Sequence, residues 1–99
     1  MKFRDHPVLK YKGFRSWPPV WVDVDTGAWK TITGEIGVLR EVRLRDSNPC
    51  RLFLTIMHDG VSFLGVLFFD NEPACRPVYE FLKAQIGRSI EEIGEMEFN

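Results

Sequence analysis

The sequence predicts a small α+β domain: a mostly antiparallel sheet of four to five strands, strongly bent or barrel-like, with one C-terminal helix packed on it. Three observations carry this prediction. Three runs of hydrophobic residues between positions 34 and 69 alternate with a period of two. An Asp-Gly pair separates the last two runs, which is a strong short-range signal for a hairpin. After residue 71 the hydrophobic period becomes that of a helix.

The 99 residues are expected to divide into a basic, aromatic N-terminal arm at residues 1–19 and a single α+β domain at residues 20–99. Prolines at positions 7, 18 and 19 keep the arm out of a helix and out of the centre of a sheet. The arm has five basic residues against one acidic, whereas residues 71–99 have three basic against six acidic. The basic head and the acidic tail can attract each other within one molecule or between two.

Residues 20–24 are expected to form the first strand of the domain, followed by a turn at residues 25–27 and a partner strand at residues 29–33. In the next run, Arg40 falls on the apolar face and Leu39 on the polar face. Either a bulge shifts the register there, or Arg40 reaches the edge of the sheet. A turn is expected at residues 46–49.

The last two runs are apolar on both faces, and a strand of this kind needs a cover on each side. One helix covers one face only. The other face carries Phe53, Met57, Leu64, Val66 and Phe68. A patch of that size is rarely left in water on a monomer, so we expect a homodimer formed through a sheet face or edge. Cover by the arm within one chain is the alternative.

The helix is expected to begin between Ala74 and Pro77 and to stop at Gly87. Ser89 and Glu92 form a capping-box pattern for one further short turn that ends at Gly94. The helix and the sheet are expected to share one core, made of Leu54, Ile56, Leu67, Phe69, Val78, Phe81, Leu82 and Ile86.

Two resemblances accompany this pattern. The segments GEIGVL, GVLFFD and IGRSIEEIG, with Cys75, Val78, Tyr79, Phe81 and Leu82 between the last two, resemble a family of short, uncharacterised bacterial proteins over about residues 33–98. This resemblance implies a bacterial origin and no chemistry. The segment DGVSFLGVLFFDN is similar to the hairpin signature of Sm-like RNA-binding proteins. The segment PACRPVYEFLK predicts a helix where that family has its second RNA-binding strand, so half of its RNA site is missing.

The sequence contains no motif for catalysis, for a cofactor or for a metal ion. His58 precedes a turn aspartate rather than a residue that orients a base, and no nucleophile with a matching motif is nearby. The two cysteines are 25 residues apart, a spacing that fits neither a redox pair nor a zinc site. We therefore expect two reduced thiols, no enzyme activity and no cofactor. The N-terminus lacks the apolar stretch of a signal peptide, and no run reaches the about 20 residues of a membrane span, so the cytoplasm is expected.

The arm is the one segment with recognisable binding chemistry. Basic and aromatic side chains interleave there, as they do in proteins that stack on bases and neutralise phosphates. The alternative is that its aromatic rings fold back over the sheet. The candidate binding residues are Lys10, Lys12, Phe14, Arg15, Trp17 and Trp21. We expect a non-enzymatic module that binds another macromolecule as a homodimer, with nucleic-acid binding through the arm as the alternative.

Overall fold

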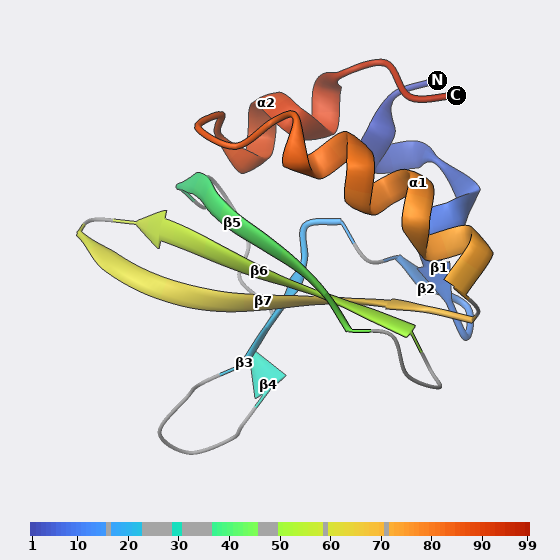
Figure 1. Ribbon diagram of the computed structural model, residues 1–99, viewed down its shortest axis with the longest axis horizontal. Coiled ribbons are helices and arrows are strands. Elements are labelled where there is room, and N and C mark those ends of the chain that lie inside the picture. The colour runs from blue at the N-terminus through green and yellow to red at the C-terminus, as the bar shows by residue number, and fades with distance from the viewer. Residues whose placement is uncertain (16, 23–28, 31–36, 46–49, 59, 71) are drawn as a thin grey trace.

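The computed structural model describes residues 1–15, 17–22, 29–30, 37–45, 50–58, 60–70 and 72–99. It is an α+β fold in which helices cover one face of an antiparallel sheet, as the sequence predicted (Figure 1). Two α-helices follow the sheet in the chain: α1 (Glu72–Lys83) and α2 (Ile90–Glu95). The two ends of the chain lie side by side next to α2 (Figure 1).

Three long strands form the body of the sheet: β5 (Val38–Arg45), β6 (Cys50–His58) and β7 (Val61–Phe69). The short strands β3 (Val20–Val22) and β4 (Trp29–Lys30) continue it beyond β7, in the order β4-β3-β7-β6-β5. The expectation of a strongly bent or barrel-like sheet of four to five strands was confirmed only in part. The strands of full length number three, and within the described residues the sheet is open, because β5 and β4 are edges that do not pair with each other.

Only part of the first predicted hairpin falls within the described residues. Val20–Val22 and Trp29–Lys30 pair in antiparallel fashion, as expected for the two strands. The rest of those strands, the turn at residues 25–27, the turn at residues 46–49 and Asp59 lie outside the described part of the chain. The hairpin around Asp59 is nevertheless defined by its strands, because His58 pairs with Val61 across the turn.

The pairing of β5 with β6 shifts by one residue between Leu39 and Glu41, so the bulge is the alternative that the structure adopts at Arg40. The shift places Leu39, Val42 and Leu44 of β5 on one face of the sheet, where they lie opposite the buried Ile56, Leu54 and Leu52. Arg43 and Arg45 project from the other face. We call the face under the helices the inner face and the opposite one the outer face.

The core lies between the inner face and the helices. Leu54, Ile56, Leu67, Phe69, Val78 and Leu82 are buried in it as expected, and Phe81 is partly buried against it. Ile86 was predicted wrongly, since 48% of it is exposed. The helix ends at Lys83, so Ile86 lies in the following turn and leaves the helical stripe.

The predicted start of the helix was also too late. α1 begins at Glu72 and contains Pro77 in its interior. Pro77 has no N–H to donate to the carbonyl oxygen of Pro73 one turn earlier. Both prolines are exposed, so water can hydrogen-bond to that carbonyl oxygen and the helix is able to continue. The N-cap at Ser89 was predicted correctly: the N–H of Glu92 donates to the Ser89 hydroxyl oxygen at 3.0 Å, at the start of α2, while the Glu92 carboxylate pairs with Arg88.

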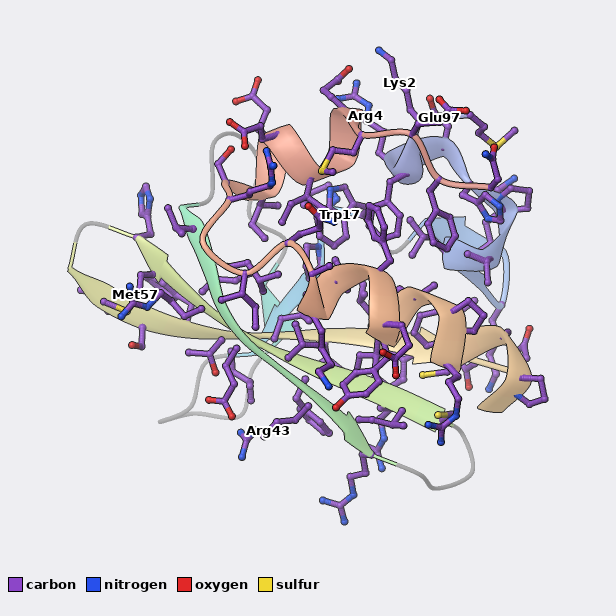
Figure 2. All side chains as sticks on the ribbon, turned by 45° about the horizontal axis from the view of Figure 1, so that its top comes forward. Lys2, Arg4, Trp17, Arg43, Met57 and Glu97 are labelled. Carbon is purple, nitrogen blue, oxygen red and sulfur yellow. The ribbon has the colours of Figure 1, made fainter. Side chains whose placement is uncertain are left out.

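The N-terminal segment contributes to the core. It forms two short 3-10 helices (Phe3–Asp5 and Pro7–Leu9) and a small hairpin of β1 (Lys10–Tyr11) and β2 (Phe14–Arg15). Phe3 and Leu9 are buried, and Phe3 lies 4.7 Å from Phe81 between ring centroids. Trp17 is 8% exposed and donates its Nε1–H to the carbonyl oxygen of Ile90 at 3.3 Å (Figure 2).

The basic head and the acidic tail attract each other within one molecule. The Glu95 carboxylate forms ion pairs with Lys2 Nζ at 2.6 Å and with Arg4 Nη1 at 2.8 Å, and the N-terminal ammonium pairs with Glu97. The hydrogen bond from Lys2 lowers the pKa of Glu95, and the nearby charge of Arg4 acts in the same direction. Figure 2 shows Lys2, Arg4 and Glu97 together beside α2, at the side of the molecule away from Arg43.

Candidate functional site

The outer face of the sheet carries basic and aromatic residues at adjacent positions of the ladder. Arg51 of β6 lies opposite Arg45 of β5 on one side and opposite Phe68 of β7 on the other. Two residues further along β6, Phe53 lies opposite Arg43. Cross-strand neighbours lie on the same face with Cβ atoms about 5 Å apart, so these five side chains form one continuous surface.

Part of this surface is hollowed. A depression of about 340 Å³ lies at the β5 edge, and its lining residues are Arg43, Leu44, Arg45, Phe53 and Leu64. Figure 2 shows Arg43 projecting from β5 away from α2, so the helices do not cover this side. The volume lies in the range of sites that hold a small organic group. Guanidinium groups with an aromatic ring between them suit a ligand that combines negative charge with a flat, apolar part.

The side chain of Arg51 is the third feature of this surface. Its Nε atom is buried and has no hydrogen-bond partner among the described residues, while its Cζ atom lies 6.0 Å from the centroid of the Phe53 ring. A buried donor left unpaired costs free energy unless something accepts its hydrogen bond. The buried Nε is out of reach of a surface ligand, so any bond to an anion would come from the Nη groups at the end of the guanidinium.

The N-terminal hairpin extends this surface. The Tyr11 ring stacks on the Phe68 ring, with centroids 5.4 Å apart and planes 25° apart, and Lys12 Nζ lies 5.3 Å from the Tyr11 centroid. Because Phe68 lies opposite Arg51, the Tyr11 and Phe68 rings connect the exposed Lys12 to the row of arginines. Positive and aromatic groups thus share one surface, which we call the basic–aromatic track: Lys12, Tyr11, Phe68, Arg51, Phe53, Arg43 and Arg45.

The predicted binding residues have different locations in the structure. Lys10 and Lys12 are exposed on the hairpin, and Lys12 belongs to the track. Phe14 and Arg15 form β2, and Trp21 in β3 pairs with Gly65, but the side chains of these three residues lie outside the described part of the structure. Trp17 is a core residue whose ring is packed against α2.

Sequence reasoning missed Arg43, Arg45, Arg51 and Phe53 as candidates. A signal for them was present, since arginines at alternate positions of one predicted strand share a face. What the sequence lacked was the cross-strand register that brings Arg51 beside Arg45 and Phe53 beside Arg43.

The apolar residues of the outer face are less exposed than the prediction of a homodimer required. Val66 is 3% exposed, and Phe53, Met57, Leu64 and Phe68 are partly buried. Tyr11 covers Phe68 from within the same chain. Cover by the N-terminal segment therefore accounts for part of what a second molecule was expected to cover.

The histidines and cysteines are the remaining side chains with catalytic or metal-binding chemistry. His6 Nδ1 accepts a hydrogen bond from the Val8 N–H at 3.1 Å, and His58 lies 6.4 Å from the Phe63 ring centroid. Cys50 and Cys75 are free thiols, and both are buried. In the described part of the chain, no three His, Cys, Asp or Glu residues are grouped so as to hold a metal ion. None of the described helices is long and apolar enough to cross a membrane.

Comparisons with protein-family models, with curated proteins and with solved structures found no match for this chain. The resemblances to the bacterial family and to the Sm-like hairpin therefore stay predictions, and the functional argument depends on the site itself.

Proposed function

We propose that this protein is a non-enzymatic module that binds single-stranded nucleic acid along the basic–aromatic track. The observation that carries the proposal is the position of Arg51, which lies between Arg45 and Phe68 on neighbouring strands and has its Cζ atom 6.0 Å from the Phe53 ring centroid. Single-strand binding proteins combine cationic groups that follow the phosphates with aromatic rings on which bases stack. The track has both elements.

Charge segregation supports an anionic partner on this face. Glu91, Glu92, Glu95 and Glu97 are exposed on or after α2, in the layer that covers the inner face. Glu41 is the acidic side chain on β5 beside the track, where its carboxylate lies 3.5 Å from Arg43. A chain with a net charge of −1 can therefore present a locally basic surface.

The main binding site in this proposal is the outer face of the sheet, and not the N-terminal arm that the sequence indicated. Of the arm, Lys12 remains part of the site, at one end of the track. An acidic protein segment is the competing partner for the same cations, but it would make no use of the aromatic rings. We further propose a reducing compartment such as the cytoplasm, which the two buried free thiols support.

The test is a fluorescence-anisotropy titration with labelled oligothymidylate of about 12 nucleotides, at several salt concentrations. If Lys12, Arg43, Arg45 and Arg51 each contact a phosphate, the slope of log K against log salt is expected to be about −3. Arg51→Met should weaken binding and reduce that slope by about 0.7. Arg88→Met is the matched control, because Arg88 is exposed in the turn before α2 and pairs with Glu92.

A second variant separates stacking from charge. Phe53→Leu keeps an apolar side chain in the sheet but removes the ring, and should weaken binding about 5- to 150-fold without changing the salt slope. Phe63→Leu is its control, since Phe63 is a partly buried ring opposite Ile56 on the inner face. Binding that is insensitive to both Arg51→Met and Phe53→Leu would refute the site. Equal binding of an acidic peptide, with no effect of Phe53→Leu, would assign the face to a protein partner.

A further inference from the structure

Among the described residues, nothing pairs with the outer edge of β5 over part of its length. At its start, the N–H of Leu39 donates to the carbonyl oxygen of Arg88 at 2.9 Å, and the N–H of Gly87 donates to that of Leu39 at 2.8 Å. The turn between α1 and α2 therefore covers the first two residues of the strand. From Arg40 to Arg45, β5 has no backbone partner on its outward side among the described residues.

The outward-facing groups of this free stretch can be identified. Residues of a strand that share a face also direct their N–H and C=O groups to the same edge. Val42 and Leu44 lie on the inner face with Leu39, so their backbone groups point outward as those of Leu39 do. An edge of this kind is a template for pairing with another strand.

The charges on the outer face of the same stretch restrict which strand can pair there. Glu41, Arg43 and Arg45 are exposed at alternate positions. Two copies of β5 can pair through their outward groups in three antiparallel registers, which place Val42 opposite Val42, Val42 opposite Leu44, or Leu44 opposite Leu44. The second register places Arg43 opposite Arg43, although it also places Glu41 opposite Arg45, and the third register places Arg43 opposite Arg45. Like charges directly opposite are destabilising.

The remaining register has complementary charges. With Val42 opposite Val42 of a second copy, Glu41 of each molecule lies opposite Arg43 of the other, and Arg40 lies opposite Leu44. Glu41 and Arg43 then occupy a pair without backbone hydrogen bonds, in which side chains approach most closely. Both side chains are more than half exposed, so neither is committed to the core of its own chain.

We propose that two copies of this chain associate through antiparallel pairing of β5 with β5 about Val42, held in register by two reciprocal Glu41–Arg43 ion pairs. The pairing joins the three long strands of each molecule into one continuous sheet. It also brings the two hollows at the β5 edges next to each other on one surface. The inference does not depend on the proposed ligand, although Arg43 belongs both to this interface and to the track.

The test is a charge exchange followed by light scattering at micromolar to millimolar concentrations. The wild type is expected to reach twice the single-chain mass of 11.5 kDa. Glu41→Arg and Arg43→Glu should each be monomeric, since each places two pairs of like charges in the interface. The double variant should dimerise again, and an equimolar mixture of the two single variants should form a heterodimer. Circular dichroism and a melting curve establish that each variant is folded, which the exposure of both positions leads us to expect.

Three results would overturn the proposal. A wild type that stays at the single-chain mass at millimolar concentration has no such interface. Single variants that remain dimeric associate through another surface. Single variants that are monomeric but do not form a heterodimer when mixed have lost association for a reason other than the Glu41–Arg43 pairing. As a matched control, Lys83→Glu reverses an exposed charge on α1, outside the β5 strand, and should leave the mass unchanged.

Discussion

Replacing Phe3 by alanine is expected to remove a large part of the stability of this fold, although the residue lies two positions from the N-terminus. The Phe3 ring is fully buried and lies 4.9, 4.7 and 5.3 Å from the ring centroids of Trp17, Phe81 and Phe98. Truncating a buried phenylalanine to alanine costs about 3–5 kcal/mol, from lost transfer free energy and from the cavity that remains. Small domains have a total stability of about 5–15 kcal/mol.

The magnitude of this loss can be measured directly. A loss of about 4 kcal/mol corresponds to a fall in Tm of roughly 16–32 °C for a domain of this size. Urea unfolding followed by tryptophan fluorescence should show a lower midpoint with an unchanged slope. Ile86→Ala is the matched control, because Ile86 is 48% exposed, and its effect should stay within about 0.5 kcal/mol. If Phe3→Ala melted within a few degrees of the wild type, the N-terminal segment would not belong to the core.

Two further predictions concern acid stability and one glycine. The pKa of Glu95 is lowered in the folded state. Its ion pairs should therefore stabilise the fold above the unfolded pKa of about 4.3, and this stabilisation should be lost as the pH falls through the folded pKa. The difference in Tm between the wild type and Glu95→Gln should shrink over that range. Equal acid profiles for both proteins would argue against the pairing of Glu95 with Lys2. Gly37 and Gly60 both have positive φ, at 70° and 77°, but only at Gly37 would a Cβ atom collide with the Met57 carbonyl group. Gly60→Ala should cost about 1 kcal/mol and Gly37→Ala roughly 1–3 kcal/mol more, and equal melting temperatures would refute the contact.

The sequence predicted which strands are apolar on both faces, and which residues share a face. This was possible because the alternation of side chains along a strand depends only on neighbouring residues in the chain. Leu54 and Ile56 are buried in the core as expected, and the N-cap at Ser89 formed because its two groups are three residues apart. Errors arose where a local signal was given too much weight. Pro77 was taken to limit the start of the helix, whereas its exposed position allows α1 to continue around it.

The N-terminal segment shows what local patterns could not supply. Its prolines and charges indicated correctly that it would not enter the main sheet as a central strand. The burial of Phe3 depends on Phe98 and on a hydrogen bond from its N–H to the carbonyl oxygen of Met96 at 2.7 Å, both at the opposite end of the chain. We therefore expect a chain that begins at Val20 to unfold, whereas the sequence pattern placed residues 1–19 in an arm outside the domain.

The contacts between the N-terminal segment and the C-terminal end also determine which positive charges are available to bind a partner. Lys2 and Arg4 neutralise Glu95 beside α2, so the surplus charge of the N-terminal segment is partly used inside the molecule. Lys10 and Lys12 remain exposed on the hairpin, where Lys12 extends the track. A recognition role should thus be sought in the hairpin and the sheet face, and not in the first five residues.

Glu41 has a role in both the proposed nucleic-acid site and the proposed dimer, and variants at this position distinguish the two proposals. Its carboxylate lies 3.5 Å from Arg43 in one chain, where it lowers the positive potential at the hollow, and it faces Arg43 of the second copy in the proposed dimer. Glu41→Arg should therefore abolish self-association while it strengthens binding of oligothymidylate and makes the salt slope steeper by about 0.7. Arg43→Glu should weaken both, because it removes a cation from the track and also disrupts the pair. If Glu41→Arg lost nucleic-acid affinity together with the dimer, the single strand would require the joined surface of two molecules rather than the track of one.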